Sequence, residues 1–389
     1  MVTTRPQQAY EAILPAEGRY CLLTPPSVMS EPGAESRDSS IRTPVRSWLE
    51  TVLGTPLSGM ESRVIGDSRG FISTTWQLLI ATDPPGLLPT SMVLKSESSN
   101  PVFQTLGRER RSFEREISFY RELAPLVEAN MPRVYGMGTN EDPWLLMEDL
   151  THLRPGDQVR GLSQSDVRSV VRRMAGIHAR FWQDSSLERY PWLPAHRYWF
   201  SEPDRSLLKA FLQEYGLRIG DQMAALLPAV LEQLGDLDAT IAGRPFTLVH
   251  GDLRADNLLF GGDESHPSAT ILDWQTASRS LGAIDLAYLI GGSEPPAERH
   301  GHLDELLYLW HGELCAHGVQ GYSLRDARHD LQLAALRCLA APLRLYATLH
   351  HPTTSVRSAL FRDEAIERHI SAAMELRAWE ALPKPLVMP

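Results

Sequence analysis

The hydrophobic pattern of the chain changes near residue 150. Before that point, short runs of β-branched and aromatic residues alternate with turn residues, which is the pattern of strands. A helix is predicted over 108–123, because Phe113, Ile117 and Tyr120 recur at helical spacing while charges fill the other positions. A shorter helix is predicted over 44–53, and five strands are predicted over residues 63–65, 71–81, 91–95, 132–137 and 144–147.

Beyond residue 150 the pattern is mainly helical. Amphipathic helices are predicted over 165–182, 204–215 and 222–234, and helices dominate again over 283–381. Short apolar strands are predicted at 247–249, 258–260 and 270–272. A β-rich part followed by a larger helical part predicts an α+β fold with two lobes and a ligand cleft. The expected division is a mobile leader over 1–44, an N-lobe over 45–150, a C-lobe over 151–381 and a tail over 382–389.

The amino-acid composition argues against nucleic acids and membranes as binding partners. The formal net charge of −10 argues against nucleic acid, because phosphate binding needs basic surfaces. No window of eighteen apolar residues is present and the first residues lack a signal-peptide pattern, so a cytoplasmic protein without a membrane partner is expected. Three widely spaced cysteines, Cys21, Cys315 and Cys338, are typical of free thiols in a reducing compartment. The sequence leaves the oligomeric state open.

The segment HGDLRADN, residues 250–257, carries the clearest chemical signal. Asp252 precedes Asn257 by five residues, the spacing of a kinase catalytic loop in which the Asp accepts the proton of the substrate hydroxyl and the Asn binds Mg²⁺. Arg254 is placed to face the transferring phosphoryl group. Asp273 follows the apolar segment 270–272 and corresponds to the second metal ligand of that template.

A lysine in the predicted third strand supplies a phosphate contact. Lys95 is one of only three lysines in the chain, and a strand lysine paired with a helix glutamate orients the α- and β-phosphates of ATP. Glu116 is the preferred partner because it lies three residues after Phe113 and four before Tyr120, beside the apolar helix face. Glu114 is the alternative partner.

The segment WLLMEDL, residues 144–150, is predicted as a strand that runs into a linker. Such a linker can present backbone groups to adenine, and the candidates for nucleotide contact are Met147, Glu148 and Leu150. An ordinary acidic loop is the alternative interpretation.

A glycine-containing segment near the N-terminus has two interpretations. Residues 66–70, GDSRG, match the GxSxG elbow of serine hydrolases, but that motif needs a helix after it and FISTTWQLLIA is strand-like. A hairpin covering phosphates fits better, with Gly66 and Gly70 allowing close backbone approach and Ser68 as a donor. The GxxxxGK[ST] motif is absent, which disfavours a Walker-type nucleotide site.

With these residues, the chain resembles the aminoglycoside phosphotransferase and choline kinase superfamily, and within it most the ecdysteroid-kinase-like branch. The segments that carry the resemblance are FEREISFYREL, LLMEDL, AGIHARFW, HGDLRADNLLF and ILDWQTASRSLGAIDLAYLI. The resemblance implies a protein-kinase-like two-lobe fold, with a five-stranded antiparallel N-lobe sheet and a mainly helical C-lobe. It also implies ATP and Mg²⁺ as cofactors and O-phosphorylation of a small-molecule alcohol.

Carried over by position, the resemblance gives each motif residue a role. Asp252 is the base, Asn257 and Asp273 bind metal, Lys95 binds phosphate, and Asp285 is structural. The substrate does not carry over. Residues 281–389 contain 13 acidic and ten Lys or Arg residues, a near balance that favours a neutral or amphiphilic alcohol over a polycation. Cleft residues expected around the acceptor are Trp310, His311, Arg344 and His350.

The sequence therefore predicts an ATP-dependent O-phosphotransferase acting on a small molecule such as an antibiotic or another natural product. A nucleotide-binding pseudokinase with a regulatory role is the alternative, disfavoured because Lys95, Asp252, Asn257 and Asp273 are all present. A protein kinase is also disfavoured, because only eleven residues separate Asp273 from Asp285 and leave no room for a long activation loop.

Overall fold

The structure is a computed structural model. It describes residues 45–65, 73–98, 100–127, 130–139, 141–195, 205–349 and 355–384. The chain forms two compact units, here called the N-lobe and the C-lobe. The N-lobe contains Met1–Ala124 and Pro132–His152, and the C-lobe contains Pro125–Met131 and Leu153–Pro389. No helix in the described ranges is long and apolar enough to cross a membrane.

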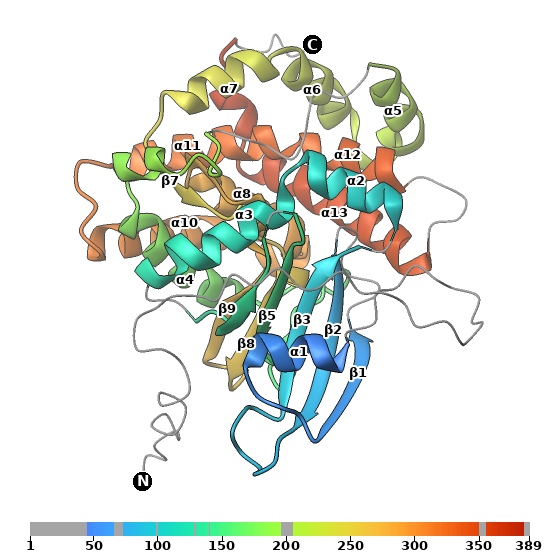
Figure 1. Ribbon diagram of the computed structural model, residues 1–389. Coiled ribbons are helices and arrows are strands. Elements are labelled where there is room, and N and C mark those ends of the chain that lie inside the picture. The colour runs from blue at the N-terminus through green and yellow to red at the C-terminus, as the bar shows by residue number, and fades with distance from the viewer. Residues whose placement is uncertain are drawn as a thin grey trace. The chain divides into compact units, whose positions relative to one another are not determined.

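The N-lobe is built on one antiparallel sheet of five strands in the order β1-β2-β3-β5-β4 (Figure 1). The predicted five-stranded antiparallel sheet is thus confirmed. Strand β3 is central, and Lys95 on it lies across from Thr75 of β2 and Leu145 of β5. The strands are β1 (Gly59–Ile65), β2 (Ser73–Ala81), β3 (Ser91–Glu97), β4 (Val134–Met137) and β5 (Trp144–Glu148).

Helix α1 (Arg46–Leu53) crosses one face of this sheet (Figure 1). Alternate side chains of the strands point toward it, as the two-residue period of a strand requires. Leu49 of α1, Leu78 of β2 and Leu146 of β5 have no exposed surface and belong to one apolar cluster. Burial of such side chains stabilises the lobe by about 1.5–3 kcal/mol each.

The helical segment after β3 is divided into two helices. The sequence predicts one helix over 108–123, whereas the structure has α2 (Pro101–Glu109) and α3 (Ser112–Ser118), followed by a π-helical turn, Phe119–Leu123. Arg111 lies between them with a φ of 53°, in the left-handed region, which ends α2 and starts α3 in a new direction.

The C-lobe is mainly helical, as predicted. Helix α8 is buried along almost its whole length and packs against α11 and α13. Serine side chains cap the first turns of α4, α11 and α13, namely Ser163, Ser323 and Ser355. The helices are α4 (Gln164–Arg180), α5 (Arg205–Ile219), α6 (Asp221–Glu232), α7 (Leu234–Ala242), α8 (Ala283–Ser293), α9 (Pro296–Arg299), α10 (Leu303–Ala316), α11 (Leu324–Cys338), α12 (Ala340–Leu349) and α13 (Val356–Glu375).

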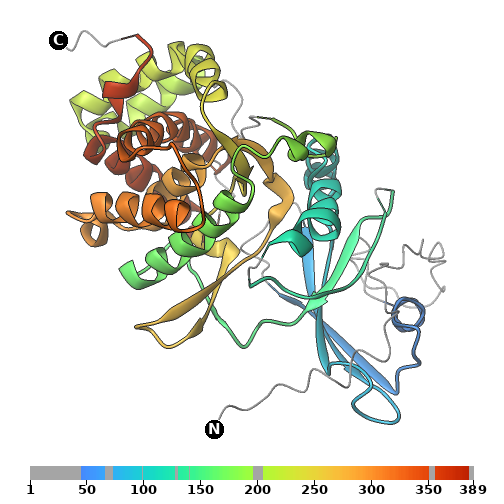
Figure 2. The same ribbon diagram turned by 90° about the vertical axis from the view of Figure 1, so that its left-hand side faces the viewer.

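Two small antiparallel sheets complete the C-lobe. Strand β7 (Phe246–Val249) pairs with β10 (Ser278–Leu281), and β8 (Leu258–Gly262) lies between β6 (Arg154–Pro155) and β9 (Pro267–Ile271). Strands β6 and β10 are absent from the sequence prediction. The hairpin of β8 and β9, gold in Figure 2, extends from the helices. Residues 250–257 connect β7 to β8, so the motif segment is held at both ends by paired strands.

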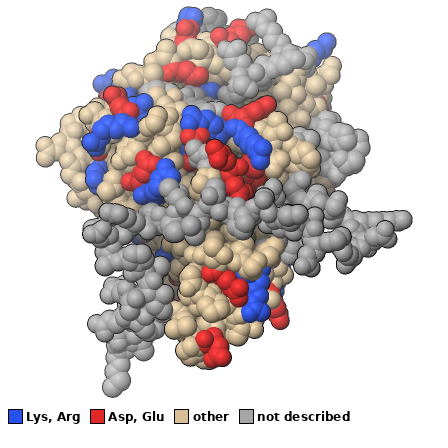
Figure 3. All heavy atoms as spheres, viewed as in Figure 1, with Lys and Arg blue, Asp and Glu red and all other residues tan. Residues whose placement is uncertain are grey.

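Surface charges on the face shown in Figure 3 are mixed in sign. Many arginines of the described C-lobe are paired with acidic residues, for example Arg168 with Glu305 and Arg328 with Asp304, each at 2.7 Å. Exposed pairs of this kind contribute little to stability, about 0–1 kcal/mol each.

A buried acid lies just after α8. Glu294 has no exposed surface, and its Oε1 lies 2.7 Å from Nε2 of His302 without the geometry of a hydrogen bond. Burial raises the pKa of Glu294 to about 7, partly opposed by the positive charge of Arg299. Burial also lowers the pKa of His302. The protonated Glu294 carboxyl is therefore the form that the fold accommodates best.

Replacing Glu294 with Gln should flatten the pH dependence of stability. The folded-state pKa of about 7 lies above the ordinary value of 4.5, so this stabilisation is complete below pH 4.5 and is lost as pH rises through 7. Between pH 5.5 and 8.5 the wild type should lose on the order of 2–3 kcal/mol more than Glu294→Gln, measured by urea unfolding. The exposed-site variant Glu380→Gln is the control, and parallel pH profiles for wild type and Glu294→Gln would contradict the assignment.

Candidate active site

The loop of residues 250–257 is anchored to the segment that follows β9. His250 Nε2 donates to the Leu272 carbonyl (2.8 Å), and Thr276 Oγ1 donates to the His250 carbonyl (2.6 Å). Gly251 has a φ of +79°, and a Cβ there would lie 2.8 Å from the Thr276 carbonyl oxygen. Only glycine fits both the backbone angle and the space.

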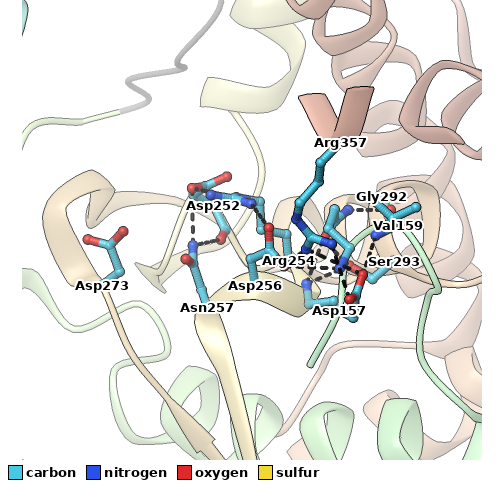
Figure 4. A network of polar contacts seen from close by, with 12 residues as sticks. Asp157, Val159, Asp252, Arg254, Asp256, Asn257, Asp273, Gly292, Ser293 and Arg357 are labelled. Carbon is cyan, nitrogen blue, oxygen red and sulfur yellow. Dashed lines mark hydrogen bonds and ion pairs between the residues drawn. The ribbon is translucent and has the colours of Figure 1, made fainter. Parts of the chain in front are cut away.

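Within this loop the three motif residues converge (Figure 4). Asn257 Nδ2 donates to the backbone oxygen of Asp252 (2.9 Å) and to its Oδ2 (3.1 Å). Arg254 Nε donates to the same Oδ2 (3.2 Å). The Asp252 carboxylate is therefore held from two sides, and the side chain of Asp252 keeps 14% of its surface exposed.

Asp273 is placed beside Asn257 by the backbone. The Leu272 N–H donates to the Asn257 carbonyl (2.9 Å), which continues the pairing of β8 with β9. Asp273 has a φ of 66°, an angle that Asp tolerates better than most residues and that is common at functional sites. Gln275 Nε2 donates to its Oδ2 (3.2 Å).

One carboxylate and one amide are suitable donors for Mg²⁺, which prefers oxygen ligands and takes the rest from phosphates and water. Asp273 and Asn257 fit that requirement. Within the described ranges, no group of three or more His, Cys, Asp or Glu side chains could hold a metal by itself. A metal bound by Asn257 and Asp273 would need further oxygen ligands from other groups.

A single buried carboxylate orients the start of the loop. Asp285 accepts the N–H of His250 at Oδ2 (2.7 Å) and the N–H of Gly251 at Oδ1 (2.8 Å). His178 Nε2 lies 3.2 Å from Oδ2 of the same carboxylate. The side chain of Asp285 is 0% exposed and that of His178 is 1% exposed, so both are fully buried.

The tautomer of His178 follows from its other neighbour. The Trp310 indole N–H, which can only donate, bonds to Nδ1 of His178 at 3.1 Å. Nε2 of His178 therefore carries the ring proton and donates to Asp285. Trp310 is 1% exposed in this network, so the expectation that it lines an acceptor cleft is wrong. The indole ring is stable in the core because its one N–H has an acceptor there, Nδ1 of His178.

Arg254 is shared between two carboxylates. Its Nη1 donates to Asp256 Oδ2 (3.2 Å), in addition to the bond with Asp252, and its guanidinium stands 5.6 Å from the ring centre of Phe361. Burial lowers the pKa of Arg254, but the carboxylates of Asp252 and Asp256 outweigh that effect and raise its pKa above the ordinary value. The side chain stays a fixed positive charge beside Asp252.

Two residues outside the sequence motifs, Gln158 and Ser293, also hydrogen-bond to the loop. The Ala255 N–H donates to Gln158 Oε1 (2.8 Å) and Ser293 Oγ (2.9 Å), and the Gln158 N–H donates to Asp256 Oδ1 (3.0 Å). A Cβ at Gly156 would lie 2.2 Å from the Ala255 carbonyl oxygen, so glycine permits this close approach. No local sequence pattern marks Gln158 or Ser293 as part of the site.

Tyr288 also lies next to Asp252. Burial raises the pKa of Tyr288 well above its ordinary value, and the nearby Asp252 carboxylate, to which it is hydrogen-bonded, adds to the effect. Tyr288 follows Asp285 by three residues on α8, so the two side chains lie on the same face of the helix. That spacing is the sequence feature that marks Tyr288 as a neighbour of the loop.

In the N-lobe, the structure brings together Lys95 and Glu116. Lys95 Nζ donates to Glu116 Oε1 (2.9 Å) and Oε2 (2.8 Å), and the two side chains are 9% and 2% exposed. Glu114 instead pairs with Arg111. The preferred partner for Lys95 is thus the one present in the structure.

The end of β5 carries the three linker candidates. Met147 is buried in the sheet, and the backbone N–H of Glu148 donates to the Arg133 carbonyl (2.7 Å). Glu148 Oε2 also accepts the Arg133 N–H (3.2 Å). Leu150 lies beyond the strand and is half-buried. The three hairpin candidates Gly66, Ser68 and Gly70 lie outside the described residues.

Asp149, which sequence reasoning missed, fastens this linker to the sheet. It accepts from Gln77 Nε2 (2.5 Å), Ser91 Oγ and the Thr151 N–H (2.8 Å). Burial raises the pKa of Asp149, but these hydrogen bonds outweigh burial and lower its pKa below the usual range.

A family model matches this chain over residues 66–314, well over half its length. The model is that of the phosphotransferase enzyme family, APH. The chain belongs to this family. No curated protein matches the sequence of this phosphotransferase.

Solved structures resemble the phosphotransferase in fold. A Ralstonia eutropha protein assigned as an aminoglycoside phosphotransferase aligns with a TM-score of 0.50 at 14% identity, covering 85% of this chain and 97% of its own. This likeness shows the kinase-like fold that the sequence predicted. Other similar structures are a macrolide 2′-phosphotransferase of Brachybacterium faecium (TM-score 0.44, 20% identity, 87% and 98% covered) and a microcompartment-associated aminopropanol kinase (0.49, 15%, 86% and 98%).

Asp285→Asn should destabilise the C-lobe. The variant places an amide N–H₂ where a backbone N–H donates, so one buried donor loses its acceptor. A loss of about 2–4 kcal/mol in the free energy of unfolding is expected. Asp304→Asn, at a site where the side chain is 57% exposed, is the matched control and should change stability little. Equal urea midpoints for Asp285→Asn and wild type would show that the carboxylate does not anchor the loop.

Proposed function

We propose that this phosphotransferase is an ATP-dependent kinase that transfers the γ-phosphoryl group to a hydroxyl of a small molecule. The observation that supports it most is the convergence of Asn257 and Arg254 on the Asp252 carboxylate, at 3.1 and 3.2 Å. A carboxylate fixed between an amide and a guanidinium is suited to orient a hydroxyl group in line with a phosphoryl group.

The roles within the C-lobe follow from the chemistry. Asp252 would accept the proton as the acceptor oxygen forms its bond to phosphorus and the bond from phosphorus to the β-phosphate oxygen breaks. Arg254 would offset negative charge on the transferring group. Asn257 and Asp273 would bind Mg²⁺, which neutralises phosphate charge when present.

The nucleotide contacts are assigned to residues 45–150 and the acceptor site to residues 151–381. Lys95, fixed by Glu116, would contact the α- and β-phosphates, with the segment around Gly66, Ser68 and Gly70 covering them. Near adenine, Leu150 is the stronger backbone candidate, because the N–H of Glu148 already donates within the sheet.

The acceptor that we propose is a neutral or amphiphilic alcohol, such as an antibiotic or another natural product. The near balance of charge in residues 281–389 supports it over a polycation. An ecdysteroid-kinase-like specificity and a cytoplasmic location belong to the same proposal. A regulatory pseudokinase is the competing function.

Asp252→Asn should abolish most of the turnover while leaving nucleotide binding intact. Loss of the base should lower kcat about 10²–10⁴-fold, with the KM for ATP changed little. The measurement is ADP release over a panel of macrolides, aminoglycosides, amino alcohols and sterols with Mg²⁺ and ATP. Asp263→Asn, in the exposed turn between β8 and β9, is the control. If no acceptor raises the wild-type rate above that of Asp252→Asn, the pseudokinase function is favoured.

Asp273→Asn should remove the effect of Mg²⁺ on nucleotide binding. Because a carboxylate is the main protein ligand in the proposed site, its loss should weaken Mg²⁺-ATP binding on the order of 10–100-fold. Calorimetric titration of ATP with and without Mg²⁺ measures this without any turnover. The same Asp263→Asn variant should bind as the wild type does, and an unchanged Mg²⁺ effect in Asp273→Asn would refute the metal assignment.

A further inference from the structure

Helix α13 contacts the catalytic loop, although it lies beyond the residues 66–314 that the family model matches. Two side chains from its first turns make the contacts. Arg357 reaches Asp157 and Asp256 (Figure 4), and Phe361 lies under the Arg254 guanidinium. They are four residues apart and so lie on the same face of the helix.

The contacts form a network of side chains whose charges alternate in sign. Arg357 Nη1 lies 3.2 Å from Asp157 Oδ2, and Arg357 Nη2 lies 3.4 Å from Asp256 Oδ1. The other oxygen of Asp256, Oδ2, accepts from Arg254 Nη1 (3.2 Å). Arg254 in turn donates to Asp252 (3.2 Å). The order is Asp157, Arg357, Asp256, Arg254 and Asp252.

Exposure decides which of these charges interact strongly. The side chain of Asp256 is 8% exposed and that of Arg254 is 13% exposed, so water screens their attraction only weakly. Arg357 is 31% exposed, at the outer end of the network. The positive charge of Arg357 offsets the negative charge of Asp256 from the solvent side.

Removing that charge would change the balance at Arg254. Without Arg357, Asp256 would have Arg254 as its remaining guanidinium partner in this network, and Arg254 would still be shared between Asp252 and Asp256. Asp256 would then attract Arg254 more strongly and draw it away from Asp252. An approaching phosphoryl group, itself anionic, would also meet a more negative surface.

We propose that Arg357 is a positioning residue that, through Asp256, keeps Arg254 directed toward Asp252 and the transferring phosphoryl group. The inference rests on the proposed kinase function for its catalytic consequence. Its structural consequence, the place of the Arg254 guanidinium, does not depend on that function.

The kinetic test uses Arg357→Met, which keeps bulk and removes charge, and Arg357→Lys, which keeps charge. The rate measured is Mg²⁺-ATP hydrolysis with water as acceptor, so that no acceptor need be known. Arg357→Met should lower kcat about tenfold, the size expected of one member of a coupled network, with the KM for ATP within about twofold. Arg357→Lys should restore most of the rate.

Two further variants separate positioning from general structure. Arg362→Met removes another arginine of α13, which pairs with Asp363 at 2.8 Å, and should leave kcat unchanged. Asp256→Asn removes the carboxylate that would pull on Arg254, so the double variant Arg357→Met with Asp256→Asn should match Asp256→Asn alone. A purely structural loss would not be relieved by the second substitution.

Crystal structures of the wild type and Arg357→Met test the proposal independently of turnover. The expected difference is loss of the Arg254 Nε to Asp252 bond and a shorter Arg254 to Asp256 bond. An unmoved Arg254, wild-type kcat in Arg357→Met, or a loss that Asp256→Asn fails to relieve would each overturn the proposal. If neither the wild type nor Asp252→Asn hydrolyses ATP, the proposed kinase function fails. The position of Arg254 in the two crystal structures then decides whether Arg357 is a positioning residue.

Discussion

The candidate site depends first on the burial of one carboxylate. An ionised Asp in the protein interior is costly unless its oxygens are satisfied, and Asp285 is satisfied by two backbone N–H groups of the loop and by His178. The cost is thus offset only when the loop has its observed conformation. The same interaction that makes Asp285 tolerable in the core therefore selects the backbone geometry from which the Asp252 side chain extends. Trp310 completes the network by fixing the tautomer of His178.

Helix α8 supports the loop at two points. Near its start, Asp285 receives the N–H groups of residues 250 and 251, and at its end Ser293 receives the N–H of Ala255. Asp285 and Ser293 are eight residues apart, about 12 Å along a helix at 1.5 Å per residue. A rigid rod of that length, buried between α11 and α13, fixes both ends of the loop at once. Asp252 and Arg254 lie between the two supports, so the position of the proposed base is held from both ends of the loop.

The sequence predicted those features that depend on neighbours along the chain. The five strands follow from local runs of β-branched and aromatic residues, and the choice of Glu116 over Glu114 follows from helical spacing against Phe113. The remaining features depend on contacts far apart in sequence. Gln158 meets Ala255 across 97 positions, and Arg357 meets Asp256 across 101. Nothing in the local pattern around Gln158 or Arg357 marks them. Strands β6 and β10 were missed for the same reason, because each is short and is defined by its partner.

The division between local and distant contacts also separates two kinds of function. The residues proposed to touch the reacting groups, Asp252, Arg254 and Asn257, lie within six positions of one another, so their relative geometry is set by one short loop. Their charge balance is not local, because Asp256 lies between Arg254 and a helix that starts a hundred residues later. Asp256 binds Arg357 through Oδ1 and Arg254 through Oδ2, so the negative charge that attracts Arg254 is shared with Arg357. The loop can therefore remain chemically the same while α13 adjusts how firmly Arg254 is held near Asp252, which separates the reaction type from its tuning.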